Sequence, residues 1–236
     1  MTEHAVVTRE AWLQARVALL EKEKAFTRKR DALSQARRAL PWVEITKSYG
    51  FDTETGHKSL DQLFGEHSQL VVYHFMFGPD WQQPCKSCSF WADNFDRIVV
   101  HLAARDVTMV AVSRAPLERL TAFKRRMGWN FEWVSSHDSD FNYDFDVSFS
   151  NDTRENSAPY YNYRTGGFPA DEAPGVSVFA KDDDGKVYHT YSTYARGLDM
   201  MNTAYHYLDL VPKGRDEDNL DMSMAWVRLR DEYTPA

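Results

Sequence analysis

Apolar residues recur at helical spacing along the first forty residues. They begin at Trp12 and end at Leu40, and charged side chains occupy most of the positions between them. Thr8 is a candidate N-cap, and Pro41 cannot continue a helix. The pattern predicts one long N-terminal helix over residues 8–39. Its second half is basic, which we interpret as a solvated face.

Beyond this helix, apolar runs typical of strands alternate with segments of helical spacing. Residues 70–77 (LVVYHFMF) have few polar interruptions, which is typical of a central strand covered on both faces. The alternation therefore predicts a mixed α/β sheet with helices on both sides. The expected strands are 43–45, 70–77, 107–112, 131–134, 176–179 and 187–191; the expected helices are 59–64, 85–104, 116–127 and 198–210.

Changes in composition along the chain predict its organisation. We expect an N-terminal helical extension over residues 1–40 and an α/β domain over 41–212. Residues 135–172 are rich in Asp, Asn, Ser and aromatic side chains, which predicts a long ordered insertion loop in this domain. The charged tail, 213–236, is expected to dock on the body through Met222, Met224 and Trp226.

Charge and hydropathy narrow the range of partners and compartments. The formal net charge is -7, whereas nucleic-acid binding proteins normally present a basic face. No apolar stretch approaches the roughly 20 residues that span a bilayer. The N-terminal residues also lack the pattern of a secretory signal. We therefore expect a cytoplasmic protein that binds neither nucleic acid nor membrane.

The two cysteines of the chain, Cys85 and Cys88, are three positions apart. Cys85 follows Pro84 at the predicted start of a helix, where free backbone amides and the helix dipole stabilise a thiolate. Lys86 adds a positive charge nearby. Cys88, one turn later, can reach the first sulfur. The pair predicts thiol–disulfide chemistry, with Cys85 as nucleophile and Cys88 as resolving thiol, acting on a protein or small-molecule disulfide.

The residues around the dithiol resemble the thioredoxin superfamily. The resemblance lies in the strand LVVYHFMF, in CKSC at the start of a helix, and in APGVSVF before a hairpin. It implies a three-layer thioredoxin-like sandwich with a mixed central sheet. It also implies that Pro174 follows a cis bond facing the dithiol, so that Ala173 and Pro174 form a substrate-binding wall. Pro84 stands where thioredoxins have a tryptophan directly before the first cysteine, and Trp81 lies four residues ahead of that cysteine. Together with Lys86, these residues are expected to bind substrate.

Thioredoxins also carry a buried acidic residue in the strand before the dithiol, and His74 aligns with it. The resemblance implies that a neutral His74 accepts the proton of Cys88; the alternative is a core histidine bonded within the protein. Most of the chain is further similar to the uncharacterised bacterial family of domain of unknown function 899. That similarity is carried by SLDQLFGEHSQLVVYHFMFGPDW, by FNYDFDVSF and by residues 226–233.

Three other interpretations remain open at this stage. The fold could serve as a redox-inactive binding or scaffold protein, and homodimerisation is a further hypothesis. Residues 107–147 resemble peroxiredoxins. A peroxidase site needs a hydroxyl residue and a cysteine at fixed spacing after a proline, but four and seven positions after Pro79 the chain has Gln83 and Lys86, so the required hydroxyl is missing. A metal-linked role would need ligands such as His101 beside the cysteines. No glycine fingerprint for a nicotinamide occurs, and we predict no cofactor or metal.

Overall fold

The computed structural model describes residues 4–150, 158–166 and 168–234. The chain divides into two compact units, Met1–Pro41 and Trp42–Ala236. The first contains the helix α1 (Arg9–Arg38). The Thr8 hydroxyl accepts a hydrogen bond from the Ala11 amide at 3.3 Å, so Thr8 is the N-cap. The predicted long N-terminal helix is confirmed.

The second unit is built on one eight-stranded mixed sheet, ordered β1-β10-β9-β4-β5-β6-β2-β3. A separate two-stranded sheet pairs β7 with β8. The strands are β1 (Val43–Glu44), β2 (Gly50–Thr53), β3 (Gly56–Ser59), β4 (Gln69–His74), β5 (Val107–Ser113), β6 (Glu132–Ser135), β7 (Tyr160–Tyr161), β8 (Arg164–Thr165), β9 (Gly175–Lys181) and β10 (Val187–Tyr194).

The centre of the sheet has the connectivity of a thioredoxin-like fold. β4 and β5 are parallel, in a register that runs from Gln69 opposite Val107 to His74 opposite Val112. On its other side β4 pairs antiparallel with β9, and β9 pairs antiparallel with β10. The order β5-β4-β9-β10, with β9 reversed, is the four-stranded thioredoxin pattern. It confirms the predicted fold class.

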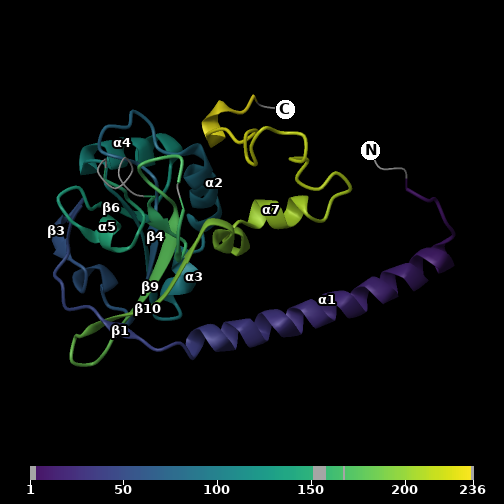
Figure 1. Ribbon diagram of the computed structural model, residues 1–236, viewed down its shortest axis with the longest axis horizontal. Coiled ribbons are helices and arrows are strands. Elements are labelled where there is room, and N and C mark those ends of the chain that lie inside the picture. The colour runs from purple at the N-terminus through teal and green to yellow at the C-terminus, as the bar shows by residue number, and fades with distance from the viewer. Residues whose placement is uncertain (1–3, 151–157, 167, 235–236) are drawn as a thin grey trace. The chain divides into compact units, whose positions relative to one another are not determined.

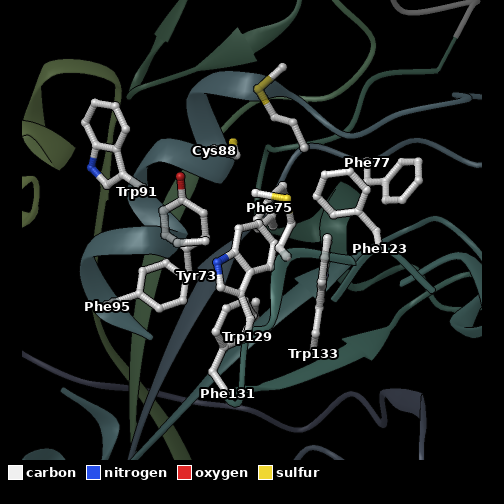
Figure 2. Close-up of a cluster of buried hydrophobic side chains, with 14 of the residues drawn as sticks. Tyr73, Phe75, Phe77, Cys88, Trp91, Phe95, Phe123, Trp129, Phe131 and Trp133 are labelled. Atoms are coloured by element: carbon white, nitrogen blue, oxygen red, sulfur yellow. The ribbon is translucent and has the colours of Figure 1, made fainter. Parts of the chain in front are cut away.

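Helices cover both faces of this sheet (Figure 1). Side chains of α2 and α4 pack in one buried cluster with Tyr73 and Phe75, whereas η1 and α5 pack on the opposite face against Leu70 and Val72. The first cluster is strongly aromatic, with Phe75 and Trp133 stacked at a centroid distance of 4.4 Å (Figure 2). The helices of this unit are η1 (Gln62–Phe64), α2 (Lys86–Phe95), α3 (Val99–Ala103), α4 (Leu117–Met127), α5 (Phe141–Asp144), η2 (Ala195–Met201), α7 (Thr203–Leu208) and η3 (Arg230–Glu232).

Two predicted helices differ in detail. The helix expected over 85–104 is two helices, α2 and α3, because the Ile98 amide bonds to the Phe95 carbonyl three residues back and tightens the turn between them. The helix expected over 198–210 is the 3-10 helix η2 followed by α7. The hairpin of β2 and β3 was not predicted. Of the insertion expected over 135–172, residues 151–157 and 167 lie outside the described residues.

The C-terminal segment packs against α2. Val227 and Leu229 are buried, and the Trp226 ring lies 5.6 Å from that of Phe90 in α2. The Arg126 guanidinium of α4 pairs with the Asp231 carboxylate at 2.7 Å. Through these contacts the segment beyond α7 contributes to the surroundings of the dithiol. Each helix in the described part of the chain is too short or too polar to span a lipid bilayer.

Candidate functional site

The dithiol sits at the start of α2, where the chain turns from the end of β4 into the helix. The Cys85 amide donates to the Met76 carbonyl at 3.0 Å, which ties the start of the helix to the segment that follows β4. Cys85 is the N-cap residue, and its carbonyl accepts the Ser89 amide at 3.0 Å. The Cys85 side chain is partly exposed, whereas Cys88 is buried, and both are free thiols. Cys85 is therefore the more exposed residue of the pair.

The two thiols have opposite acidities. The pKa of Cys85 is lowered to about 6, chiefly because the Cys88 thiol hydrogen-bonds its sulfur; the backbone amides of Cys88 and Ser87 also favour the thiolate, against the effect of burial. The pKa of Cys88 is raised well above that of a free thiol by burial and by the neighbouring Cys85 sulfur. This difference fits a nucleophilic Cys85 and a Cys88 that holds its proton until the first reaction has occurred.

Tyr73, in β4, lies beneath the dithiol. Its hydroxyl hydrogen-bonds the Cys88 sulfur and lowers the pKa of that thiol against the larger effect of burial. Burial itself raises the pKa of Tyr73 well above its ordinary value, so this hydroxyl remains a donor. Figure 2 shows Tyr73 directed toward Cys88 and α2. Tyr73 was not predicted from the sequence, although the alternation of side chains along β4 could have identified it once the face of the dithiol was known.

His74 points to the other face of the sheet. It stacks on Phe145 at a centroid distance of 5.9 Å, and its Nε2 lies 2.8 Å from the Ser177 hydroxyl. Burial lowers the pKa of His74 to about 3, so the imidazole is neutral. Since successive residues of a strand face opposite ways, the structure does not bring His74 to Cys88. Its placement matches the alternative interpretation, a core histidine bonded within the protein.

Pro174 lines the same cavity as the two cysteines, but no peptide bond among the described residues is cis. The cis bond expected before Pro174 is therefore trans in the structure. The Pro174 carbonyl accepts the Tyr161 hydroxyl at 2.8 Å. Ala173 is buried, and its amide donates to the Val147 carbonyl at 2.8 Å, so it supports this wall of the cavity from behind.

The remaining predicted site residues lie around the dithiol and not in the cavity. The Trp81 indole N–H donates to the Asp171 carboxylate at 3.1 Å and closes over Gly78, where a Cβ atom would lie 2.9 Å from the indole nitrogen. Pro84 is buried where the loop enters α2. The Lys86 ammonium donates to the Ala225 carbonyl at 3.0 Å, so it binds the C-terminal segment.

A cavity of about 440 Å³ adjoins the dithiol, and we call it the dithiol cavity. Its other walls are formed by Trp91, Phe168, Leu198 and Tyr205 from the body, and by Arg215, Glu217 and Met224 from the C-terminal segment. Nothing in their sequence spacing pointed to these residues. Within the part of the chain that the structure describes, no three His, Cys, Asp or Glu side chains are grouped to hold a metal ion.

The family profile of a bacterial protein of unknown function, DUF899, matches residues 1–233. The chain belongs to this family. No curated protein matches the sequence. The family assignment predicted from the sequence is therefore confirmed, while the family description specifies no activity.

Solved structures similar to this chain are peroxiredoxins of thioredoxin-like fold. Peroxidoxin BcpB from Mycobacterium tuberculosis is 14% identical, with a TM-score of 0.46 over 70% of this chain and 94% of its own. Peroxiredoxin Q from Xanthomonas campestris is 13% identical, with a TM-score of 0.49 over 71% and 94%. The mitochondrial 2-Cys peroxiredoxin from Plasmodium falciparum is 12% identical, with a TM-score of 0.41 over 71% and 91%. These are similarities of fold, and the strand order above carries the fold assignment.

Proposed function

We propose that this member of the DUF899 family is a thiol–disulfide oxidoreductase whose reactive centre is Cys85 and Cys88. The observation that carries the proposal is the pairing of a partly exposed Cys85, whose pKa is lowered to about 6, with a buried Cys88 that hydrogen-bonds it. At neutral pH such a Cys85 is mostly thiolate, which is the nucleophilic form.

The reaction has two exchanges. The Cys85 thiolate attacks one sulfur of a substrate disulfide; a Cys85–substrate disulfide forms, and the second substrate sulfur leaves as a thiolate. Cys88 then loses its proton and attacks the Cys85 sulfur, which releases the first substrate sulfur and closes an 85–88 disulfide. Two electrons pass from the dithiol to the substrate. A thiol or dithiol reductant returns the protein to its starting state.

The neighbouring residues support both steps. The Cys88 thiol and the amides of the first turn of α2 stabilise the attacking thiolate. Once the first mixed disulfide has formed, Cys85 carries no charge, so one of the causes that raise the pKa of Cys88 is removed. The Tyr73 hydroxyl then stabilises the Cys88 thiolate as it develops. Ionisation of Cys88 is in this way coupled to attack by Cys85.

The test is the stoichiometry with an aromatic disulfide that releases a coloured thiolate. The reduced protein is expected to release two thiolates per chain and to end with an 85–88 disulfide detectable by mass spectrometry. Cys88→Ser should release one thiolate and keep the other bound to Cys85. Cys85→Ser should react far more slowly, because Cys88 is buried. A wild-type protein that stops at one thiolate, or a Cys85→Ser variant as fast as wild type, would overturn the proposal.

A further inference from the structure

The walls of the dithiol cavity are apolar where they approach the sulfurs. Tyr73, Met76 and Trp91 lie on the side of the body. Phe168 comes from a loop and Leu198 from η2, and Met224 closes the cavity from the C-terminal segment. Aromatic and thioether groups of this kind bind apolar surfaces and adapt to their shape. A volume of about 440 Å³ lies within the range of small-molecule sites.

The charged groups that line this cavity already have partners within the protein. The Arg215 guanidinium donates to both Asp199 oxygens at 3.0 and 2.8 Å, and to both Asp209 oxygens at 2.7 and 2.8 Å. Arg196 also lines the cavity and contacts Asp199 at 3.4 Å, but its side chain is 81% exposed and belongs to the rim. Arg215 therefore offers little free charge to a ligand carboxylate.

The Glu217 carboxylate also has hydrogen-bond partners within the protein. Its Oε1 accepts the Tyr205 hydroxyl at 2.7 Å, the Trp226 indole N–H at 2.6 Å and the Met224 amide at 3.1 Å. A ligand carboxylate placed here would lose its hydration without gaining a partner of opposite charge, which is costly. The cavity interior thus selects against carboxylates.

We propose that the dithiol cavity binds the uncharged alkyl or aryl group of a low-molecular-weight disulfide whose sulfur is attacked by Cys85. This inference rests on the proposed oxidoreductase function and names its substrate class. The group attached to the attacked sulfur occupies the cavity, while the leaving thiolate departs toward the opening. Charged disulfides such as glutathione disulfide are disfavoured because the cavity walls leave their carboxylates unpaired.

The test is a series of symmetrical disulfides of increasing chain length: dimethyl, diethyl, di-n-propyl and di-n-butyl disulfide, with glutathione disulfide as the charged member. The rate at which the reduced full-length protein consumes each disulfide is divided by the rate at which 2-mercaptoethanol consumes the same disulfide. This ratio corrects for the intrinsic reactivity of the disulfide. We expect this ratio to rise about fourfold for each methylene, from ~0.8 kcal/mol of burial per CH₂. The ratio for glutathione disulfide should fall below that for diethyl disulfide.

Ser223 provides a matched pair of variants, because it lines the cavity from an exposed position. Ser223→Trp should fill the space and remove most of the advantage of dibutyl over dimethyl disulfide, whereas Ser223→Ala should keep it. If every ratio is near one, the proposed function fails. If the ratios are high but independent of chain length, or highest for glutathione disulfide, the function stands and the apolar specificity is wrong.

A second, independent observation concerns α1. Alanine followed by a large apolar residue recurs every seven positions, as Ala11–Trp12, Ala18–Leu19, Ala25–Phe26, Ala32–Leu33 and Ala39–Leu40. No residue of α1 is buried, and the large side chains of this repeat are 44 to 67% exposed. A strict seven-residue period over this length is the pattern of a helix that supercoils with another helix.

A second copy of α1 matches this pattern in length and period. α1 has 30 residues, whereas the next longest helix among the described residues, α4, has 11. Charge favours an antiparallel pair: residues 28–38 hold five cations and one anion, while residues 9–24 hold four cations and three anions. A parallel pair would place the two strongly basic halves side by side, and an antiparallel pair separates them.

We infer that the chain forms a homodimer through an antiparallel pair of α1 helices centred on Phe26. In this arrangement Trp12 faces Leu40 of the second copy, and Leu19 faces its Leu33. The alanine of each repeat allows the helices to approach closely, while the large residue fills the space beside it. The interface is thus self-complementary about a two-fold axis.

Sedimentation of the full-length protein tests the dimer. Wild type is expected to sediment as a dimer and Phe26→Glu as a monomer; Gln35→Glu, the same charge change on the opposite side of the helix, should remain dimeric. Spin labels on Gln14→Cys, with Cys85 and Cys88 replaced by Ser, test the orientation. An antiparallel pair separates them by about 36 Å along the axis. A monomeric wild type overturns the dimer. Two spin labels with no separation along the helix axis overturn the antiparallel arrangement.

Discussion

At the scale of single residues, the environment of each sulfur determines its role. Cys85 and Cys88 belong to one motif, yet burial and hydrogen bonding move their pKa values in opposite directions. The largest effect on Cys85 comes from the Cys88 thiol, which makes the second cysteine a determinant of the reactivity of the first.

Replacing Cys88 should therefore change the acidity of Cys85. In wild type, the alkylation rate of Cys85 should rise with pH through about 6 and level off above neutrality, because only the thiolate reacts. Cys88→Ala removes the main hydrogen bond and should move this midpoint upward by about one to two pH units. Cys88→Ser keeps a hydroxyl donor and should stay near wild type. Equal midpoints in the two variants would contradict this origin of the low pKa.

Tyr73 and His74 can be separated by their effects on the second exchange. Tyr73→Phe removes the hydroxyl that stabilises the Cys88 thiolate and should slow release of the second substrate thiolate by about tenfold, with the first exchange unchanged. His74→Asn should leave both exchanges unchanged in the folded protein, because His74 lies on the other face. Stopped-flow measurement of the two releases decides between them; a slow second release in His74→Asn alone would restore the interpretation drawn from sequence.

At the scale of elements, α2 is held at both ends. Its start is fixed by the bond between Cys85 and Met76. At its C-terminal end, the buried Asp96 carboxylate accepts the backbone amides of Asn130 and Phe131 at 2.5 and 3.3 Å, which ties the helix to the segment before β6. A helix anchored at both ends keeps Cys85 and Cys88 in fixed positions above Tyr73.

Removing this C-terminal anchor should cost stability. Asp96→Ala leaves two amides without their acceptor and is expected to lower the free energy of unfolding by about 2 kcal/mol. Asp96→Asn keeps one side-chain oxygen that can accept both amides, so its loss should be smaller. Urea denaturation of the two variants measures the difference. A loss in Asp96→Asn as large as in Asp96→Ala would show that charge, and not the acceptor, matters at this position.

At the scale of the whole molecule, a buried carboxyl group couples stability to pH. Glu172, directly before Ala173 and Pro174, accepts the Ser148 hydroxyl at 2.6 Å and pairs with Arg114 at 3.0 Å. Burial outweighs these partners and raises the pKa of Glu172 from 4.5 to about 7. The native state therefore holds a proton that the unfolded chain releases between these values.

The contribution of this proton to stability is complete below pH 4.5 and is lost as pH rises through 7; the two pKa values correspond to about 3 kcal/mol. His74 acts in the opposite sense between pH 3 and 6.5, because its pKa is lowered. The stability of Glu172→Gln relative to wild type should therefore rise by about 3 kcal/mol as the pH rises from 4.5 to 8. Urea denaturation across this range measures it, and a difference that does not vary with pH would contradict the raised pKa.

Features that depend on local spacing could be predicted from the amino-acid sequence alone. Helical periodicity and the Thr8 cap defined α1, a buried strand followed by two cysteines one turn apart defined the dithiol at the start of α2, and the alternation of strands and helices defined the sheet. These features follow from the chemistry of neighbouring residues, so one chain is enough to predict them.

The side chains that share the site could not be predicted in this way, because their grouping depends on tertiary packing. In an apolar run such as residues 70–77 both faces of the strand are buried, so sequence could not tell that Tyr73 and not His74 faces Cys88. Arg215, Glu217 and Met224 reach the cavity only because the C-terminal segment folds back over α2. Contacts between distant segments depend on how the elements pack, and no local pattern encodes them.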